Sequence, residues 1–151
     1  MTELFTSFDG RINRQTWWIG TVILFVALVI LSVILAFLFG DGFLGRLIGL
    51  VVGLGALYPA VALASKRLHD RGKPMMPWVA LFFGPGALVS FLNTFNIGFR
   101  PMRMGGEAVM APGLIVSALS LVALLAFIWA LVELGFLKGQ PEPNAYGPPP
   151  S

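Results

Sequence analysis

The sequence predicts an all-α fold, an integral membrane bundle of four transmembrane helices. Composition is the first reason: 57% of the 151 residues are hydrophobic and only 11% are charged, whereas a soluble domain carries about 25% charged residues. The second reason is that four apolar stretches approach the length of about 20 residues that crosses a bilayer. We expect residues 1–137 to form a single transmembrane domain and residues 138–151 to form a proline-rich cytoplasmic tail.

The first two predicted spans are residues 17–39 and 43–65. Residues 17–39 contain no charged side chain, and a helix of this length reaches about 35 Å, enough for a hydrocarbon core of about 30 Å. Gly40-Asp41-Gly42 predicts a tight turn between the two spans. In the second span, Pro59 predicts a kink, and Arg46 can extend its side chain to the membrane interface.

The third and fourth predicted spans are residues 78–99 and 112–137. Gly84-Pro85-Gly86 lies within the third, so a broken or re-entrant helix is an alternative to a full crossing. The fourth span begins at a proline, which suits the first position of a helix. Residues 100–111 are expected to form a loop.

The distribution of cationic residues predicts the orientation, because cytoplasmic loops carry an excess of Lys and Arg. With four spans, seven of the ten fall on one side, namely Arg11, Arg14, Lys66, Arg67, Arg71, Lys73 and Lys138. Three fall on the other side, namely Arg46, Arg100 and Arg103. Both termini and the loop expected around His69 are therefore predicted to be cytoplasmic.

A row of small residues in the second span predicts close helix packing. Gly45, Gly49 and Gly53 form two overlapping G-x-x-x-G units, and such units let helix backbones approach each other in a membrane. The partner is another helix of the bundle, a second copy of the chain or another membrane protein. The alternative is that these glycines reflect only the high glycine content of membrane helices.

Glu133 is an ionisable residue in the last predicted span, and such residues are costly in a membrane. One interpretation is a structural partner for a cytoplasmic Arg or Lys, with Arg67 or Lys66 as the named candidates. The other is a proton- or ligand-coupled site.

The residue types present exclude several kinds of site. The chain has no cysteine and one histidine, His69, so thiolate chemistry and the usual histidine metal sites are not expected. Neither a G-x-S-x-G elbow nor a glycine-rich phosphate loop occurs. We therefore expect no catalytic set, no metal and no cofactor, and we interpret the excess of cations as topology rather than nucleic-acid binding.

Three short polar stretches stand out against the apolar background: residues 8–14 (FDGRINR), 66–73 (KRLHDRGK) and 144–148 (NAYGP). In this order around hydrophobic spans they resemble the DUF805 family of small bacterial inner-membrane proteins, with its patterns F-x-G-R-x-x-R, R-R-L-H-D and N-x-Y-G. The matching positions are Gly10, Arg11, Arg14, Arg67, His69, Asp70, Asn144, Tyr146 and Gly147. Lys66 departs from the first arginine of the second pattern. The resemblance implies a multi-pass protein of the inner membrane and no established activity.

These motif residues have more than one physical interpretation. Arg11 and Arg14 can bind lipid phosphates, or they can pair with Asp70 in a polar layer beneath the bundle. His69 is expected to hydrogen-bond at a helix end, with proton shuttling as the alternative. In the tail, Asn144 and Tyr146 either dock under the bundle through a turn and ring packing or belong to an extended, mobile segment.

The leading functional hypothesis is a non-enzymatic membrane scaffold or interaction subunit, with membrane lipids, a second copy or other membrane proteins as partners. The second hypothesis is a small transporter or channel component that uses Glu133 and the polar loop. A lipid-headgroup enzyme would rest on Arg11, Arg14, His69 and Asp70, and this is the least supported hypothesis.

Overall fold

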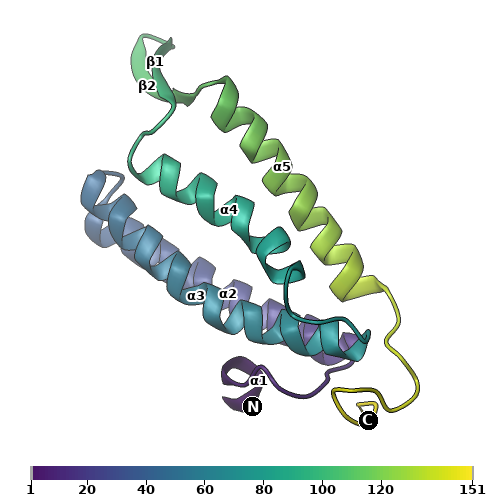
Figure 1. Ribbon diagram of the computed structural model, residues 1–151. Helices are drawn as coiled ribbons and strands as arrows, with labels where there is room; N and C mark the ends of the chain where they lie inside the picture. Colours follow the sequence, from purple (N-terminus) through teal and green to yellow (C-terminus); the bar gives the residue numbers. More distant parts are fainter. Residues whose placement is uncertain (1, 151) are drawn as a thin grey trace.

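The computed structural model describes residues 2–150, and most of them are helical (Figure 1). The elements in chain order are α1 (Thr2–Thr6), α2 (Arg14–Phe39), α3 (Phe43–Asp70), α4 (Trp78–Thr94), β1 (Phe99–Met104), β2 (Glu107–Pro112), α5 (Leu114–Ala130) and the π-helix η1 (Leu131–Phe136). Figure 1 shows the pair α2–α3 beside the pair α4–α5. Both chain ends lie near one end of these helices, and the β-hairpin lies at the other.

Among the described residues, three helices are long and apolar enough to cross a membrane: α2, α3 and the segment Leu114–Phe136 formed by α5 and η1. Helix α4 is also apolar but has only 17 residues, which corresponds to about 25 Å. Three of the four predicted spans therefore have the length and composition of a transmembrane helix.

Local sequence explains where α2 begins and ends. The side chain of Asn13 accepts a hydrogen bond from the Thr16 N–H at 2.8 Å, which satisfies one of the free donors in the first turn. At the other end Gly40 has φ +63°, a conformation that glycine adopts without steric cost. Its N–H donates to the Ala36 carbonyl at 2.9 Å, and the chain then turns into α3.

Helix α3 is longer than predicted, because it continues through Lys66 to Asp70. The polar stretch around His69 was expected to be a loop, and that expectation is wrong. Gly72, with φ +69°, ends the helix, and its N–H donates to the His69 carbonyl at 2.9 Å. Because the last turn is helical, its polar side chains point in several directions and meet different elements.

Helix α4 runs without a break from Trp78 to Thr94 and contains Pro85 in its interior. The possible break at Gly84-Pro85-Gly86 is therefore wrong. A proline removes one backbone hydrogen bond from a helix, but the apolar residues on both sides keep the other bonds of α4 in place. The helix ends five residues before the predicted limit at residue 99, where Asn96 and Gly98 have φ +53° and +76°.

Residues 100–111 form most of an antiparallel β-hairpin, so the expectation of a loop here is wrong. The fold is mostly helical, as expected, but this small two-stranded sheet means that it is not all-α. Met104 pairs with Glu107, which leaves Gly105 and Gly106 as the two turn residues. Both have positive φ, +61° and +92°, as a two-residue hairpin turn requires. The hairpin also moves the start of the last helix from residue 112 to Leu114.

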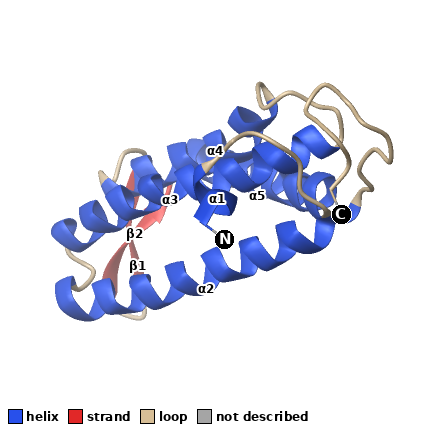
Figure 2. Cartoon of the chain, turned by 90° about the horizontal axis from the view of Figure 1, so that it is seen from below, coloured by secondary structure: helices blue, strands red, loops and turns tan. Residues whose placement is uncertain are grey.

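The buried apolar core combines residues of α2, α3, α4 and η1, and Figure 2 shows the β-hairpin and the C-terminus at opposite ends of the helices. Trp17 of α2, Leu63 and Leu68 of α3, Phe82 of α4 and Leu134 of η1 belong to the core. Helix α1 packs against α3 near this core, and the ammonium of Lys66 donates to the Glu3 and Leu4 carbonyls at 2.5 and 2.9 Å. By contrast, most of α2 beyond Gly20 presents its apolar side chains outward.

Candidate functional site

The last turns of α3 are buried although they are rich in charge. Every residue from Ala62 to Asp70 is buried, and Arg67 is 0% exposed. A buried charge is stable only when it is paired and hydrogen-bonded. We use the name polar cluster for the side chains gathered here, namely Arg11, Arg67, His69, Asp70, Arg71, Lys73, Glu133, Asn144 and Tyr146.

Asp70 at the end of α3 is held between two arginines. Its Oδ1 accepts from Arg11 Nη2 at 3.0 Å, and its Oδ2 pairs with Arg67 Nη1. The side chains of all three residues are almost completely buried. Ion pairs between guanidinium and carboxylate groups have directional hydrogen bonds, so Asp70 fixes the positions of both arginines.

Arg11 connects the N-terminal segment to the C-terminal tail. Besides Asp70, its guanidinium donates to the carbonyls of Gln140, Glu142 and Gly147 at 2.5, 3.0 and 3.0 Å. One side chain therefore joins parts of the chain that are more than 120 residues apart in sequence. The predicted pair of Arg11 with Asp70 is present.

The end of η1 is capped by side chains from other helices. Carbonyl groups at the end of a helix have no partner within it. Here the Leu134 carbonyl accepts from Arg67 Nε at 2.8 Å, the Gly135 carbonyl from Trp18 Nε1 at 3.1 Å, and the Phe136 carbonyl from Arg14 Nη1 at 3.1 Å. Cations also suit the negative end of the helix dipole. Arg14 therefore caps a helix and does not pair with Asp70, which corrects that part of the prediction.

Glu133 lies in η1 and is buried, with 4% exposure. Its Oε1 accepts from Arg71 Nε at 2.7 Å and from Lys73 Nζ at 2.6 Å. The expected pairing with a cation is present, but both named partners are wrong. Arg67 is bound to Asp70 and to two carbonyls, and Lys66 is bound to the Glu3 and Leu4 carbonyls. Lys73 also lies over the ring of Trp78, 4.1 Å from its centroid. Glu133 thus joins η1 to the segment between α3 and α4.

The tail is docked on the end of α3. The rings of His69 and Tyr146 stack with centroids 3.9 Å apart and planes 5° from parallel. The Asn144 side-chain amide donates to the His69 carbonyl at 2.9 Å, and its Oδ1 accepts from the Tyr146 N–H at 2.9 Å. Asn144 and Gly147 also form a β-bridge. Of the two alternatives for the tail, the docked one is present.

His69 is enclosed by groups that can hydrogen-bond to its ring. Its Nδ1 lies 3.3 Å from the Gly10 carbonyl, and its Nε2 lies 3.5 Å from Ser65 Oγ. With Tyr146 on one face, this histidine helps to hold together the first and third polar stretches. Within residues 2–150, no group of three or more His, Asp or Glu side chains is placed to hold a metal ion.

Two glycines allow this close packing. A Cβ at Gly139 would overlap the carboxylate of Asp70, and a Cβ at Gly135 would lie 2.8 Å from a ring carbon of Trp18. The sequence reasoning did not single out either glycine or the capping role of Trp18. The residues next to Gly135 and Gly139 in sequence do not indicate these roles, because the groups that they contact, Trp17, Trp18 and Asp70, belong to helices distant in sequence.

The three glycines predicted to pack against another helix lie away from the polar cluster. A Cβ at Gly49 or Gly53 would meet no atom within 4 Å among the described residues. A Cβ at Gly45 would collide with the Gly40 carbonyl oxygen, which belongs to the turn before α3 and not to a facing helix. The predicted tight helix contact is therefore wrong within the chain, because the helices diverge here and leave open grooves along α3.

Comparison with known proteins finds relatives but no structural precedent. The uncharacterized protein YiiR of Escherichia coli strain K12 is 28% identical over 142 residues, which cover 93% of this chain and 84% of the relative. YiiR of Escherichia coli O157:H7 matches to the same extent. No solved structure matches the chain. A family model described as a protein of unknown function, DUF805, matches residues 5–148, a range that includes all three polar stretches. The chain therefore belongs to the DUF805 family.

Proposed function

We propose that this chain is a multi-pass protein of the bacterial inner membrane that crosses the bilayer four times. The three long apolar helices support membrane insertion, and α4 is the fourth and shortest crossing. Both termini lie near one end of the helices, as an even number of crossings requires. That end is cytoplasmic, because it carries most of the Lys and Arg residues. A phosphatase reporter that is active only outside the cytoplasm, when fused to the C-terminus, is expected to be inactive; strong activity would contradict this topology.

Within that membrane the chain acts as a non-enzymatic scaffold or interaction subunit. One observation carries this proposal: both buried carboxylates, Asp70 and Glu133, are each held between two cations. Groups held this way stabilise the closed arrangement of α3, η1 and the tail. The outward apolar face of α2 then supplies a surface for other membrane helices, whose association depends on packing rather than on the hydrophobic effect.

Single cysteines along α2 test the scaffold role, because the chain contains none of its own. Val26, Ile30 and Val33 are exposed and recur at a spacing of three to four residues on one helix face. Cysteines at these positions are expected to give crosslinked protein adducts in intact membranes. A cysteine at Met102 on the exposed hairpin is the control, because its adducts give the yield of crosslinking by random collision. If α2 gives no adduct above that control, the scaffold role is wrong.

A transporter or channel component is the second candidate, and the π-helix that contains Glu133 favours it, because π-bulges are frequent at functional sites. Glu133→Gln separates the two functions. The scaffold predicts a chain with a lower unfolding temperature, since Arg71 and Lys73 lose a charged partner. The transporter predicts a stable chain whose solute or ion flux in proteoliposomes has a changed pH dependence.

A further inference from the structure

Two grooves run along α3 at the end opposite the polar cluster. One, of about 550 Å³, lies between α3, α4 and α5, and the other, of about 490 Å³, lies between α2 and α3. Both are lined by Arg46, Gly49 and Gly53, so they meet along the glycine row of α3. We use the name trough for the two grooves together. Each groove has the size of a small-molecule site.

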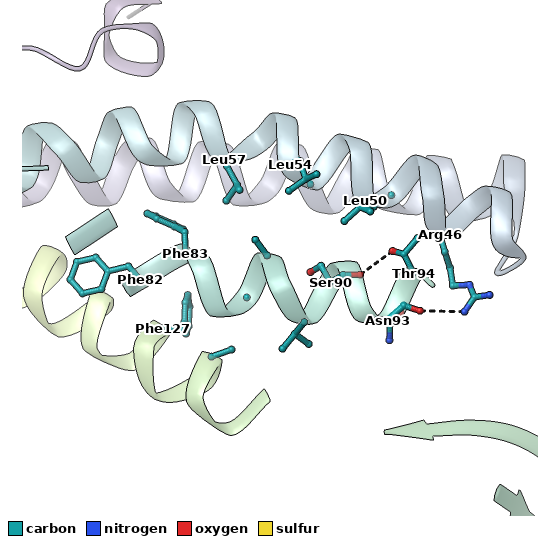
Figure 3. A pocket seen from close by; sticks show the side chains of 16 residues that line it. Arg46, Leu50, Leu54, Leu57, Phe82, Phe83, Ser90, Asn93, Thr94 and Phe127 are labelled. Carbon is teal, nitrogen blue, oxygen red and sulfur yellow. Dashed lines mark hydrogen bonds between the residues drawn. The ribbon is translucent and has the colours of Figure 1, made fainter. Parts of the chain in front are cut away.

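The trough has one cation at its end. Arg46 lies near Asn93 and Thr94 at one end of the first groove (Figure 3). Its Nη1 donates to Asn96 Oδ1 at 2.7 Å, but its Nε is buried and has no hydrogen-bond partner within residues 2–150. A buried donor is costly without an acceptor. A guanidinium is suited to bind the oxygens of a phosphate with two parallel hydrogen bonds.

The rest of the first groove is apolar and runs along the helices. Figure 3 shows Leu50, Leu54 and Leu57 on α3 along its length, with Phe82 and Phe83 at the end away from Arg46. Arg46 and Leu57 are separated by about three helical turns, or roughly 16 Å. One leaflet of a bilayer core is roughly 15 Å thick. The groove therefore has the direction and length of an acyl chain whose headgroup is at Arg46.

The second groove offers a parallel path on the other side of the glycine row. Its α2 wall includes Phe25, Leu28 and Leu35, and Asp41 lies at the same end as Arg46. Because Asp41 is negative, a headgroup with an ammonium beyond its phosphate fits this end better than a headgroup with net negative charge.

We propose that the trough binds one diacyl phospholipid, with its phosphate on Arg46 and one acyl chain in each groove. The proposal rests on the membrane location proposed above and is independent of the scaffold role. It explains why α3 has glycine where the grooves meet: a side chain at Gly49 or Gly53 would occupy the volume that the lipid fills.

Native mass spectrometry of the full-length chain in detergent tests the phosphate contact. The probes are dioleoylphosphatidylethanolamine and dioleoylglycerol, which share acyl chains but differ in the headgroup. The wild-type chain is expected to retain one phospholipid, about tenfold more tightly than dioleoylglycerol. Arg46→Gln is expected to remove this preference, and Arg46→Lys to keep part of it.

Arg103→Gln is the matched control, because Arg103 is an exposed cation on the hairpin at the same end. It is expected to leave phospholipid retention unchanged. The proposal is wrong if Arg46→Gln keeps the preference for phospholipid or if both variants lower it equally. The measurement uses the isolated chain, so its outcome does not depend on whether α2 binds a protein partner.

A pair of glycines in α4 tests the groove itself. Gly86 lines the first groove and Gly84 does not, while a Cβ at either position would meet no atom within 4 Å among the described residues. Gly86→Leu is expected to weaken retention of both lipids about tenfold, and Gly84→Leu to leave it unchanged. Equal effects would overturn the proposal. If Gly86→Leu instead converts a dimer to a monomer with lipid retention unchanged, a second copy occupies the groove and the lipid proposal is wrong.

Discussion

The two ends of the molecule differ in how closely their parts are packed. At the end with both termini, the polar cluster joins the segment before α2, the end of α3, η1 and the tail through ion pairs, a carbonyl cap and a stacked ring pair. At the other end α3 is flanked by open grooves, and the hairpin is largely exposed. The family motifs all lie at the closed end.

This difference shows that the polar residues and the glycine row have different roles. Charges that would be costly alone are placed where several elements can pair with them. Small residues are placed where the helices diverge, so that they create space instead of contact. We therefore expect substitutions at the closed end to change stability and substitutions at the open end to change binding.

The largest effect is expected for Asp70→Asn. The change leaves the buried guanidinium groups of Arg11 and Arg67 without a carboxylate, and breaking a buried ion pair from one side costs about 3–5 kcal/mol. Thermal unfolding in detergent measures the loss. Arg103→Ala, at an exposed position of the hairpin, is expected to unfold like the wild type. A melting temperature of Asp70→Asn equal to that control would show that the cluster is not the main source of stability.

A smaller effect is expected for Gly135→Ala. The added Cβ would lie 2.8 to 3.1 Å from ring atoms of Trp17 and Trp18, and forcing extra volume into a packed site typically costs about 1–3 kcal/mol. The same unfolding measurement applies. Gly55→Ala is the matched control, because a Cβ at Gly55 would meet no atom within 4 Å among the described residues. Stability unchanged at both positions would mean that α2 and η1 are less closely packed than described.

Tyr146→Ala is expected to release the tail with a smaller loss of stability. Removing one partner of a stacked ring pair costs about 0.5–1.5 kcal/mol beyond the lost area. Limited proteolysis should then cleave the tail faster, with the helical part intact. Tyr146→Phe retains the stacked ring and should resist cleavage like the wild type; rapid cleavage of the wild type would contradict the docked tail.

The smallest effect on global stability is expected for Gly106→Val in the hairpin. A β-branched residue is strained at φ +92°, so the turn should open and become accessible to protease. The unfolding temperature of the chain should stay within error of the wild type, because the hairpin makes few contacts with the core. A large fall in that temperature would show that the two ends are coupled.

The residues that form the candidate site could be predicted from sequence better than their partners could. The polar stretches identified Arg11, His69 and Asp70 because charges are rare in this chain. The partner of Glu133 was wrong for a tertiary reason: Arg67 is already bound to Asp70 and to two carbonyls, so Arg71 and Lys73 pair with Glu133 instead. The sequence alone does not show which cations are already paired with other groups.

The fold could be predicted where long apolar runs dominate. The end of α2 at Phe39 was predicted, because Gly40 terminates the helix. Its start at Arg14 lies three residues before the predicted residue 17, because Asn13 caps the helix. The hairpin was missed although Gly105-Gly106 is a turn signal, because Met and Arg on the flanking strands show no clear alternation. The helical state of Lys66–Asp70 depended on tertiary partners that supply the opposite charges.

The docking of the tail has a consequence for biosynthesis. Arg11 and Asp70 are translated before three carbonyl acceptors of Arg11, which belong to Gln140, Glu142 and Gly147. Because chains emerge from the ribosome N-terminus first, the cluster can close only after the last helix has been made. A chain that stops before residue 140 lacks these three acceptors, so closure of the cluster requires that synthesis has passed η1.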